Sequence, residues 1–375
     1  MKRFFCAIVA CLTLVSCLQK GGVTLIPASD FDAVVDGKEV KLYTLKAGDL
    51  TMQVTNFGGR VVSLWTPDKD GNHEDIVLGY NNIDKYVNNP GERFLGAVVG
   101  PYANRIADGS YTIGDQTYNF PQNNNGQTLH GGLKGLDMVV WDVFAADDTT
   151  LVLTYTHPDG QDGMPGNLEI FMTYTLTSSN EFKVEYLAQT DKPTHVNLSH
   201  HSFFNLKGEG NGTINDHILY INGSWTTPVN EVLIPSGELA DVTGTPFDFR
   251  KPKAIETDLY IDDAQLNNGA GYDHNWVLDR QTPDQLELAA SVLEPSSGRY
   301  MEVWTDQPAL QFYGGNFFDG STTGKYGKTL NYRESIALET QKYPDTPNHP
   351  NFPSTLLNPG EEYEHVCVYR FSTVR

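Results

Sequence analysis

Cysteine is scarce in this chain of 375 residues, which contains four of them. Three of the four, Cys6, Cys11 and Cys17, lie in a short N-terminal segment that we interpret below as a targeting signal. Cys367 alone is left in the rest of the chain, so an intrachain disulfide is excluded there. The sequence also lacks a C-x-x-C pair and a His/Cys cluster, which argues against a structural zinc site. We expect Cys367 to be a buried thiol in the alternating run 365–371.

Positive charge is also in short supply. Lysine and arginine number 26 against 47 aspartates and glutamates, which gives a formal net charge of −21. No basic stripe is available to neutralise phosphates, and this argues against nucleic acid as a partner. The acidity is typical of a well-solvated surface. A bound structural Ca²⁺ is the alternative explanation, although the sequence contains no EF-hand-type loop.

Long hydrophobic runs are absent too. The apolar run Phe4–Val15 is too short to cross a bilayer, which takes ~20 residues. It follows Lys2 and Arg3 and precedes Leu14-Val15-Ser16-Cys17, which resembles the lipobox of bacterial lipoprotein signal peptides. In that family the cut falls before the cysteine, which becomes lipidated. A plain secretory signal is the alternative interpretation.

These features divide the chain into three parts. Residues 1–17 are expected to be a lipoprotein-type signal peptide, residues 18–30 a tether, and residues 31–375 a single domain. A lipid on Cys17 would then be the only link to a membrane. The expected location is the cell envelope of a bacterium, either in the periplasm or anchored to the outer membrane.

Helical periodicity is scarce as well, with 254–260 as the one short candidate. Instead, short alternating segments separated by Gly, Pro and Asn follow one another along the chain. The clearest period of two runs through Leu168–Leu176 and Glu181–Thr190, and the turn T-S-S-N between them predicts a hairpin. This pattern predicts an all-β fold of antiparallel strands, a sandwich or a barrel. Long polar loops are expected at residues 81–95, 121–135 and 342–358.

One stretch, Thr194–Leu206, combines histidines with apolar residues. It has the sequence T-H-V-N-L-S-H-H-S-F-F-N-L and holds three of the ten histidines within seven residues, His195 to His201. Such a mixture suits neither a core strand nor an exposed loop, so it predicts a polar site on a partly buried strand. One of these histidines is therefore a candidate proton-transfer group. Because side chains alternate across a strand, only one of His200 and His201 can face the site.

Glu339 is a second unusual residue. It lies in the strand-like run A-L-E-T-Q, and no other charged residue occurs between Ser335 and Gln341. A lone glutamate in a strand is usually solvated, but in these apolar surroundings a carboxylate needs a partner. A glutamate and a histidine form an acid–base pair that works near neutral pH, because their unperturbed pKa values are about 4.3 and 6.5.

Further polar residues lie beside glycines or aromatics at predicted strand ends. They are Asn104, Arg105, His130, Asp273 and Gln311. Each has a structural explanation: Arg105 could form a surface salt bridge, His130 could be a hydrogen-bonded loop residue, and Asp273 could cap a turn. The sequence contains no Walker loop, GxGxxG or GxSxG motif. Carboxylates, amides, arginine and aromatic rings together suit a hydroxyl-rich ligand such as a sugar.

Six ordered motifs resemble those of the aldose 1-epimerase family. They are N-R-I (104–106), L-H-G-G (129–132), N-L-S-H-H-S-F-F-N-L (197–206), G-Y-D-H-N-W (271–276), Q-F-Y-G-G-N-F (311–317) and L-E-T-Q (338–341). The similarity extends from about residue 35 to the C-terminal tail. It implies a large antiparallel β-sandwich, the galactose mutarotase-like supersandwich. It also implies interconversion of the α and β anomers of free aldohexoses such as glucose or galactose, with no required cofactor and no metal.

The resemblance also implies residue roles. Glu339 matches the base that takes the proton of the anomeric hydroxyl, and His201 matches the acid that protonates the ring oxygen. The ring opens to the aldehyde, rotates about C1–C2 and closes again. The residues that match substrate-holding positions are Asn104, Arg105, His130, Asp273 and Gln311.

The chain departs from the family motif at two positions, His200, where Asn is more common, and Phe203, where Tyr is more common. Three other functions are compatible with the residues. A glycoside hydrolase could use Glu339 and Asp273, and a carbohydrate-binding β-sandwich could retain the site without catalysis. A phosphosugar mutarotase would need cations in addition to Arg105. The expected partner is a free sugar, and the expected state is a monomer.

Overall fold

A computed structural model describes residues 22–88 and 91–375 of the chain. The predicted signal peptide, its Cys17 and the first part of the predicted tether lie outside these described residues. In the described part of the tether, Ile26 is buried. Its N–H donates to Gln53 Oε1 and its carbonyl accepts from Gln53 Nε2, both at 2.9 Å. This reciprocal pair fixes the chain to the sheet several residues before the first strand.

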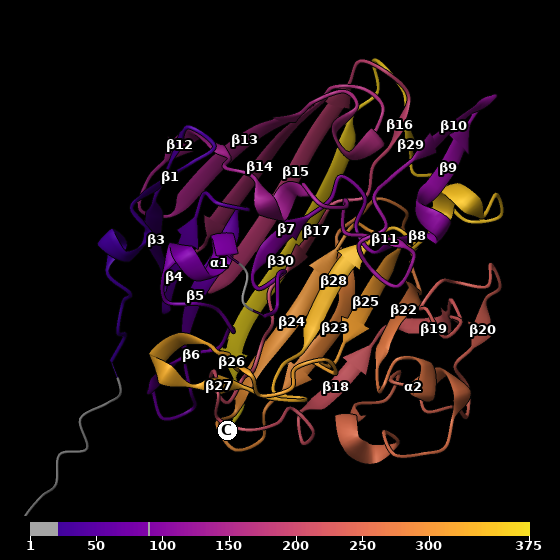
Figure 1. The fold of residues 1–375 in the computed structure, drawn as a ribbon. Coiled ribbons are helices and arrows are strands. Elements are labelled where there is room, and N and C mark those ends of the chain that lie inside the picture. The colour runs from indigo at the N-terminus through magenta and orange to yellow at the C-terminus, as the bar shows by residue number, and fades with distance from the viewer. Residues whose placement is uncertain (1–21, 89–90) are drawn as a thin grey trace, which may run out of the picture.

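The largest sheet has nine antiparallel strands and forms the back layer in Figure 1. In their order across the sheet they are β12 (Asp142–Ala146), β13 (Thr150–His157), β14 (Leu168–Leu176), β15 (Glu181–Thr190), β30 (Tyr363–Thr373), β24 (Arg299–Thr305), β23 (Glu287–Leu293), β18 (Ile218–Ile221) and β21 (Lys253–Ala254). The predicted hairpin is β14–β15, with the predicted bounds. Its alternate residues are buried along both strands, so the period of two in the sequence marks the face that packs on the core.

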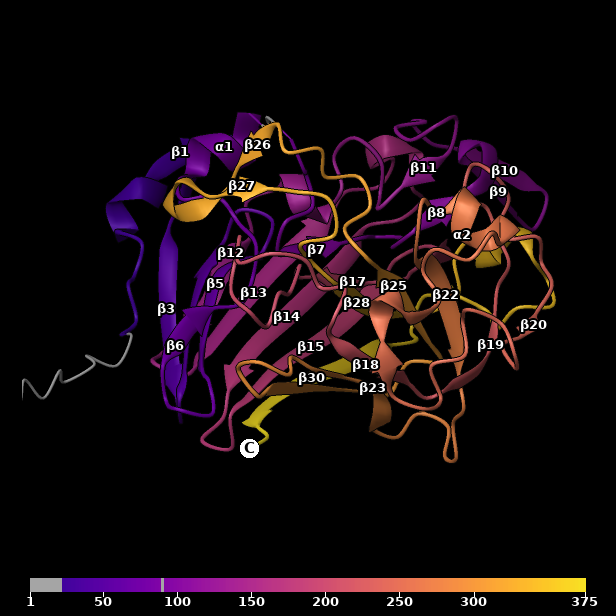
Figure 2. The same ribbon diagram turned by 90° about the horizontal axis from the view of Figure 1, so that it is seen from below.

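Two further antiparallel sheets lie over this large sheet. One is ordered β20 (Ala240–Asp241), β19 (Gly223–Thr226), β22 (Asp273–Leu278), β25 (Ala309–Tyr313) and β28 (Ala337–Gln341). The other is ordered β3 (Leu42–Ala47), β4 (Leu50–Thr55), β5 (Arg60–Pro67) and β6 (His73–Asp75). Seen from below, β15, β30 and β23 of the large sheet form a lower layer, and β28, β25 and β22 lie above them (Figure 2). The structure therefore confirms the predicted all-β antiparallel sandwich.

A short pair of strands, β7 (Ala97–Val99) and β17 (Ser199–His201), lies between the two upper sheets (Figure 1). On one side, Val61 N in β5 donates to the carbonyl of Gly96 at 2.9 Å, just before β7. On the other side, Ser199 Oγ in β17 donates to the carbonyl of Thr340 in β28 at 2.9 Å. This pair thus joins the two upper sheets into one layer.

The remaining strands form two-stranded ribbons, and helices are few and short. The ribbons pair β1 (Ala33–Val35) with β2 (Lys38–Val40), β8 (Arg105–Ile106) with β11 (Thr128–Leu129), β9 (Ser110–Ile113) with β10 (Gln116–Asn119), β16 (Thr194–His195) with β29 (Leu356–Leu357), and β26 (Thr322–Thr323) with β27 (Thr329–Leu330). The α-helices of the described residues are α1 (Ile83–Asn88) and α2 (Ala264–Asn268). The 3₁₀ turns are Ala28–Phe31, Ala107–Gly109, Leu136–Met138, Gln161–Gly163, Ile255–Thr257, Lys325–Gly327 and Thr346–Asn348.

Two of the sequence expectations for local structure differ from these elements. The loop expected at residues 81–95 contains α1, which starts after Asn82 and buries Ile83 and Tyr86 on one face. Asn82 Oδ1 accepts the N–H of Lys85 at 3.1 Å, so the helix has an Asn cap that the sequence pattern does not reveal over so short a span. The candidate helix at 254–260 is a single 3₁₀ turn.

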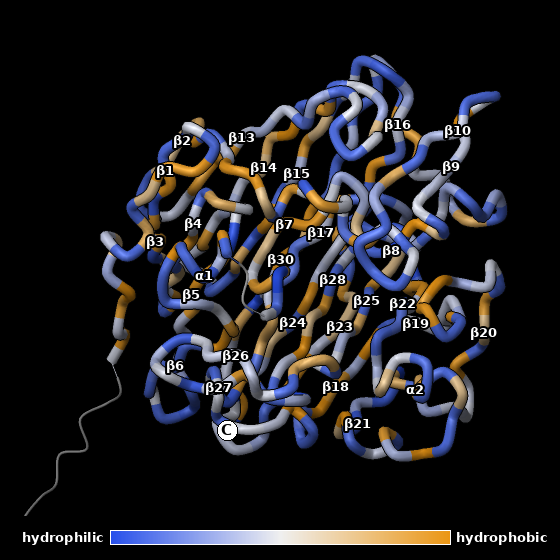
Figure 3. The backbone as a smooth tube through the Cα atoms, viewed as in Figure 1, coloured by the Kyte–Doolittle hydropathy of each residue, from blue (hydrophilic) through white to orange (hydrophobic). Residues whose placement is uncertain are grey.

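The core fills the space between the two layers. One hydrophobic cluster contains Met172 and Tyr174 of the large sheet, Val54 of β4 and Phe312 of β25. Hydrophobic residues accordingly concentrate along the central strands, and the peripheral loops are mostly hydrophilic (Figure 3). Cys367 is buried in this core as a free thiol, as expected. Within the described ranges, no helix has the length and apolar character needed to cross a bilayer.

Gly96 makes the close contact between β5 and the strand pair β7–β17. It has φ +66°, and a Cβ there would lie 2.0 Å from the carbonyl oxygen of Val61. Its N–H donates to the carbonyl of His201 at 3.0 Å. Only glycine fits, because any side chain would push β5 away from the strand that carries His201.

Replacing Gly96 by alanine is expected to destabilise the protein by about 3 kcal/mol or more, because an unfavourable φ is combined with a steric clash. Gly114 is the matched control, since it has a similar φ of +59° but open space around its missing Cβ. Gly114→Ala should cost only about 1–2 kcal/mol. Urea unfolding of both variants measures the difference, and equal losses would show that the close contact at Gly96 is unimportant.

Candidate functional site

The site is built where β17 and β28 lie side by side in the upper layer. Ser199 bonds to Thr340, and just beyond these strands Phe204 and Ile336 exchange backbone hydrogen bonds, both 2.8 Å long. This arrangement places His201 Nε2 3.4 Å from Glu339 Oε1. Both side chains are buried, with 4% and 2% of their surface exposed. The two residues that the sequence singled out as an acid–base pair are therefore in contact.

His200 points to the opposite side of β17, as alternation along a strand predicted. Its ring packs against Phe182 and Tyr369 of the large sheet. Tyr174 Oη lies 3.2 Å from Nδ1, and Ser202 Oγ lies 2.6 Å from Nε2. Because Tyr174 donates its own proton to the carbonyl of Gly59, the Nδ1–H tautomer of His200 satisfies all these groups. His200 is therefore a core residue that connects the two layers.

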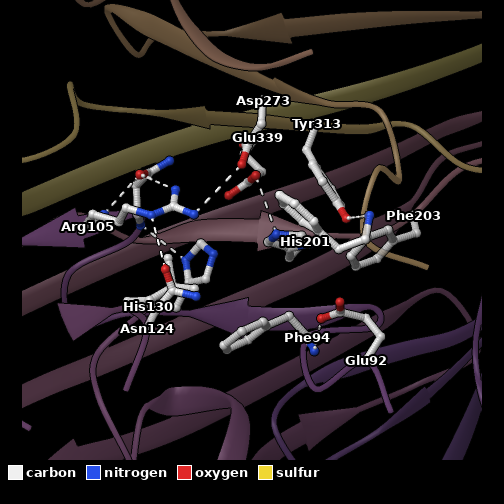
Figure 4. A pocket seen from close by; sticks show the side chains of 13 residues that line it. Glu92, Phe94, Arg105, Asn124, His130, His201, Phe203, Asp273, Tyr313 and Glu339 are labelled. Carbon is white, nitrogen blue, oxygen red and sulfur yellow. Dashed lines mark hydrogen bonds and ion pairs between the residues drawn. The ribbon is translucent and has the colours of Figure 1, made fainter. Parts of the chain in front are cut away.

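A cavity of about 250 Å³ opens at His201 and Glu339. It is smaller than the ~300–1,000 Å³ usual for drug-sized ligands, which suits one small molecule. Its lining comprises Glu92, Phe94, Asn104, Arg105, Asn124, Leu129, His130, His201, Phe203, Asp273, Tyr313, Phe317 and Glu339 (Figure 4). Six of the seven residues predicted from the sequence thus line a single pocket.

The seventh, Gln311, supports this pocket from its wall. Its Nε2 donates to Asp273 Oδ1 at 2.7 Å, and in the β25–β28 ladder it is the register partner of Glu339. The other carboxylate oxygen of Asp273 lies 3.7 Å from a guanidinium nitrogen of Arg105. Asp273 is therefore held between a cation and an amide, rather than capping a turn, and Arg105 is not a surface residue.

Asn104 and His130 hold each other in unusual backbone conformations, with φ of +62° and +51°. The N–H of Asn104 donates to His130 Nδ1 at 3.1 Å, and the N–H of His130 donates to the carbonyl of Asn104 at 3.0 Å. The next residue, Gly131, has to be a glycine, because a Cβ there would lie 2.0 Å from the carbonyl oxygen of Gly100. Since Nδ1 of His130 is an acceptor, its proton is on Nε2, which becomes a donor to the pocket.

Burial controls the protonation of the pair. It raises the pKa of the Glu339 carboxyl well above the ordinary value; the nearby charge of Asp273 adds to this shift and Arg105 opposes it. Burial lowers the pKa of His201 to about 3. Although the two groups are close enough for an ion pair, both shifts favour the neutral pair. Burial also lowers the pKa of His130 well below its ordinary value, so this imidazole stays neutral.

Several buried polar atoms in the site have no hydrogen-bond partner within the described part of the chain. They include Glu339 Oε2, His201 Nδ1 and Gln311 Oε1. A buried unsatisfied polar atom costs about 1–3 kcal/mol, so such atoms are uncommon unless a ligand or water completes them. His201 and Glu339 line the cavity and Gln311 lies behind Asp273, so a ligand with several hydroxyl groups suits this place.

Several pocket residues were not predicted from the sequence. Tyr313 and Phe317 belong to the motif Q-F-Y-G-G-N-F, so their closeness in sequence to Gln311 could have predicted that they line the pocket. Their rings stack with centroids 5.7 Å apart. Glu92 and Asn124 lie in two of the expected polar loops, where no local pattern distinguishes them from solvated residues.

In the described ranges, one grouping of His, Cys, Asp or Glu side chains has the spacing to hold a metal ion, namely His130, His201 and Glu339. Two imidazoles and one carboxylate do not resemble the all-oxygen shell of Ca²⁺. A transition metal on His130 Nε2 would require the proton to move to Nδ1, where the N–H of Asn104 already donates. The tautomer of His130 therefore favours a hydrogen-bond donor over a metal ligand.

The chain is similar to known proteins over nearly all of its length. The sequence model of the family described as aldose 1-epimerase matches residues 41–370. Galactose mutarotase of Mus musculus is 40% identical over 342 residues, which cover 90% of this chain and 95% of the mouse protein. Aldose 1-epimerase of Escherichia coli (strain K12) is 36% identical over 340 residues, which cover 90% and 96%. These matches confirm the resemblance that the sequence motifs indicated.

Solved structures agree with the sequence matches. The aldose epimerase homologue from C. elegans superposes with a TM-score of 0.81 at 28% identity, covering 90% of this chain and 100% of the other. Galactose 1-epimerase from Lactobacillus acidophilus NCFM superposes with a TM-score of 0.78 at 30% identity, covering 92% and 97%. The fold is therefore that of the galactose mutarotases.

Replacing His200 by asparagine should make the protein less sensitive to acid. Burial lowers the pKa of His200 to about 3, whereas an unfolded histidine titrates near 6.5. Below pH 6.5 the unfolded chain therefore takes up a proton that the folded chain does not. The contribution of His200 to the free energy of unfolding is complete above pH 6.5 and is lost as the pH falls below it. Between pH 7 and 5 the native protein should lose about 2 kcal/mol more than the variant. Urea unfolding at both pH values tests this, and equal losses would contradict it.

Proposed function

The chain belongs to the aldose 1-epimerase family, and from this premise we propose that its pocket interconverts the α and β anomers of free aldohexoses such as glucose and galactose. The observation that carries the proposal is the 3.4 Å approach of His201 Nε2 to Glu339 Oε1 in a buried, sugar-sized cavity. This geometry supplies one proton acceptor and one proton donor to the same small ligand.

The proposed reaction moves one proton on each side of the anomeric carbon. Glu339 takes the proton of the anomeric hydroxyl while His201 gives its Nε2 proton to the ring oxygen. The C1–O5 bond breaks and the open-chain aldehyde forms. Rotation about C1–C2 presents the other face of the carbonyl, and the reverse transfers close the ring. Atoms and charges balance, because His201 and Glu339 share one exchangeable proton throughout.

The protonation state of the pair has to change during this cycle. Ring opening starts from imidazolium and carboxylate and ends with neutral imidazole and carboxylic acid. Burial favours the neutral state, which corresponds to the open-chain sugar. Hydrogen bonds from the bound pyranose to the unpartnered oxygen Oε2 of Glu339, together with the charge of Arg105, stabilise the carboxylate and bring the two states closer in free energy.

The proposal assigns the remaining predicted residues to substrate positioning. His130 donates through Nε2, and Arg105 with Asp273 offers donors and acceptors for neighbouring hydroxyls. Asn104 shapes this end of the pocket, since its Oδ1 accepts the N–H of Arg105 at 2.9 Å. Gln311 acts through its bond to Asp273. Fixed side chains of this kind hold the sugar in the reactive orientation.

The alternative functions fit these contacts less well. A glycoside hydrolase needs a second carboxyl group for the bond that breaks, but Asp273 is already bound to Gln311 and Arg105. A phosphosugar enzyme needs a free cation, and Arg105 is paired. The relatives are named galactose mutarotase and aldose 1-epimerase. These names do not favour a glycoside hydrolase, a phosphosugar enzyme or a non-catalytic binding module.

The proposed enzyme works without a cofactor, since two side chains carry both protons. A structural Ca²⁺ elsewhere stays a prediction. We propose that residues 31–375 form the catalytic domain, that its partner is the sugar alone, and that it is a monomer.

Replacing Glu339 by glutamine or His201 by asparagine should reduce the catalysed rate about 10²–10⁴-fold each, because each variant removes one proton-transfer group. The double variant should be little slower than either single one, since the two groups act as a unit. Polarimetry of fresh α-D-glucose and α-D-galactose, corrected for spontaneous mutarotation, measures the rates. His200→Asn is the control in the same strand and should retain activity. If both site variants equilibrate the anomers as fast as the native protein, the assignment is wrong.

We also propose that the chain is a lipoprotein of a bacterial cell envelope, located in the periplasm or anchored to the outer membrane. The sequence Leu14-Val15-Ser16-Cys17, after a basic and then an apolar segment, supports this. One lipidated N-terminal cysteine would hold the catalytic domain at a membrane surface through the short tether.

The full chain, produced in a bacterium with a labelled fatty acid, should incorporate the label and partition into the detergent phase. Cys17→Ser should lose both properties while the enzymatic rate per folded molecule is unchanged, because Cys17 precedes the catalytic domain. An unlabelled native protein in the aqueous phase would contradict the lipoprotein proposal and leave the enzymatic one intact.

A further inference from the structure

Glu92 is a pocket carboxylate that the proposed reaction does not use. It precedes β7 and lines the cavity together with Phe94. Tyr80 Oη donates to its carbonyl at 3.2 Å, and Phe94 N donates to its Oε1 at 2.9 Å. Arg60 braces the segment that follows by donating to the carbonyls of Arg93 and Leu95 at 2.8 and 3.0 Å. The carboxylate is therefore fixed in place.

Burial raises the pKa of Glu92 and the nearby Arg60 and Arg93 oppose this shift, but neither arginine forms an ion pair with the Glu92 carboxyl. In residues 22–88 and 91–375, no lysine, arginine or histidine forms a salt bridge with it. The adjacent cation, Arg93, forms two bonds of 2.7 and 2.9 Å with Asp137 instead. Arg60 also lies against Asp137, at 3.5 Å. Glu92 thus has one oxygen, Oε2, available to a ligand.

The other charges of the pocket cancel. Arg105 is paired with Asp273, and His201 and Glu339 share one proton. Glu92 and Arg105 lie at opposite ends of the pocket, with the acid–base pair between them (Figure 4). A pyranose whose anomeric carbon lies at the pair, and whose ring extends away from Arg105, brings the substituent on C2 or on C5 to Glu92.

Resting on the proposed function, we propose that Glu92 selects substrates by charge. The pocket accepts aldopyranoses that carry a protonated amino group at least as well as neutral ones, and it rejects those that carry a carboxylate or a phosphate. An ammonium group next to Glu92 forms a charge-assisted hydrogen bond, whereas an anion meets a like charge and finds no free cation. Neutral sugars use the same oxygen as an ordinary hydroxyl acceptor.

The test compares kcat/KM for four kinds of aldohexose by polarimetry, at a pH where the amine is protonated. The sugars are galactose, 2-amino-2-deoxygalactose, 6-amino-6-deoxygalactose and galacturonate, with glucose 6-phosphate as a second anion. For the native protein, at least one amino sugar should match or exceed galactose. Both anions should fall about tenfold or more below galactose, as expected for one like-charge contact inside the pocket.

Glu92→Gln keeps the acceptor for Phe94 N–H but removes the charge. The ratio of amino sugar to galactose should drop about tenfold, and the ratio of galacturonate to galactose should rise. Glu92→Asp, which retains the charge, should keep the native order of preference. Glu231→Gln is the matched control, because it removes one carboxylate from an exposed loop outside the pocket and should leave all ratios unchanged.

Unchanged ratios in Glu92→Gln, or equal native activity on galacturonate and galactose, would overturn the charge selection while leaving the proposed function intact. Failure of the native protein to accelerate any neutral hexose would overturn both. If Glu92→Gln does not fold, as judged by circular dichroism, the native comparison of neutral, cationic and anionic sugars still decides the question.

Discussion

The 3.4 Å approach of the His201 imidazole to the Glu339 carboxylate is the constraint on which the rest of the structure depends. Two side chains that are both more stable in water are brought together in a buried place. They lie in different sheets, His201 in β17 and Glu339 in β28. The bond from Ser199 to Thr340 and the backbone pair between Phe204 and Ile336 fix their separation. The upper layer must therefore close between its two sheets, which requires a residue without a side chain at position 96.

Burial shifts the pKa values of the two groups in opposite directions, since it raises that of Glu339 and lowers that of His201. Both shifts disfavour charge, so the pair prefers to be neutral. The proposed reaction takes a proton from one oxygen of the sugar and gives a proton to another. It therefore requires the charged and the neutral states of the pair to have similar free energies. The fixed dipoles around the pair, such as the Nε2–H that Asn104 imposes on His130, can stabilise one state without having to reorganise.

The sequence predicted the central parts of this arrangement because they leave local signals. Alternation along a strand predicted that only one of His200 and His201 faces the site, the family resemblance indicated His201, and a lone carboxylate among apolar neighbours marked Glu339. The hairpin β14–β15 was predicted to its end residues. The helix α1 was missed because six residues give too little periodicity. Glu92 was missed because its place in the pocket follows from the path of a loop, which depends on Arg60, Tyr80 and other residues distant in sequence.

Glu92 therefore differs from the other charged pocket residues in lying outside the six sequence motifs. The charges of the motif residues cancel in pairs. Arg105 is paired with Asp273, and protonated His201 is paired with ionised Glu339. A balanced pocket recognises hydroxyl groups by geometry and is indifferent to the charge of the sugar. An additional carboxylate, held by a backbone contact outside the motifs, adds an acidic hydrogen-bond acceptor at one end of the cavity. Because the cavity is small, a bound ligand lies close to this carboxylate. Selectivity for charge can therefore change through a loop while the proton-transfer pair and the sandwich beneath it stay the same.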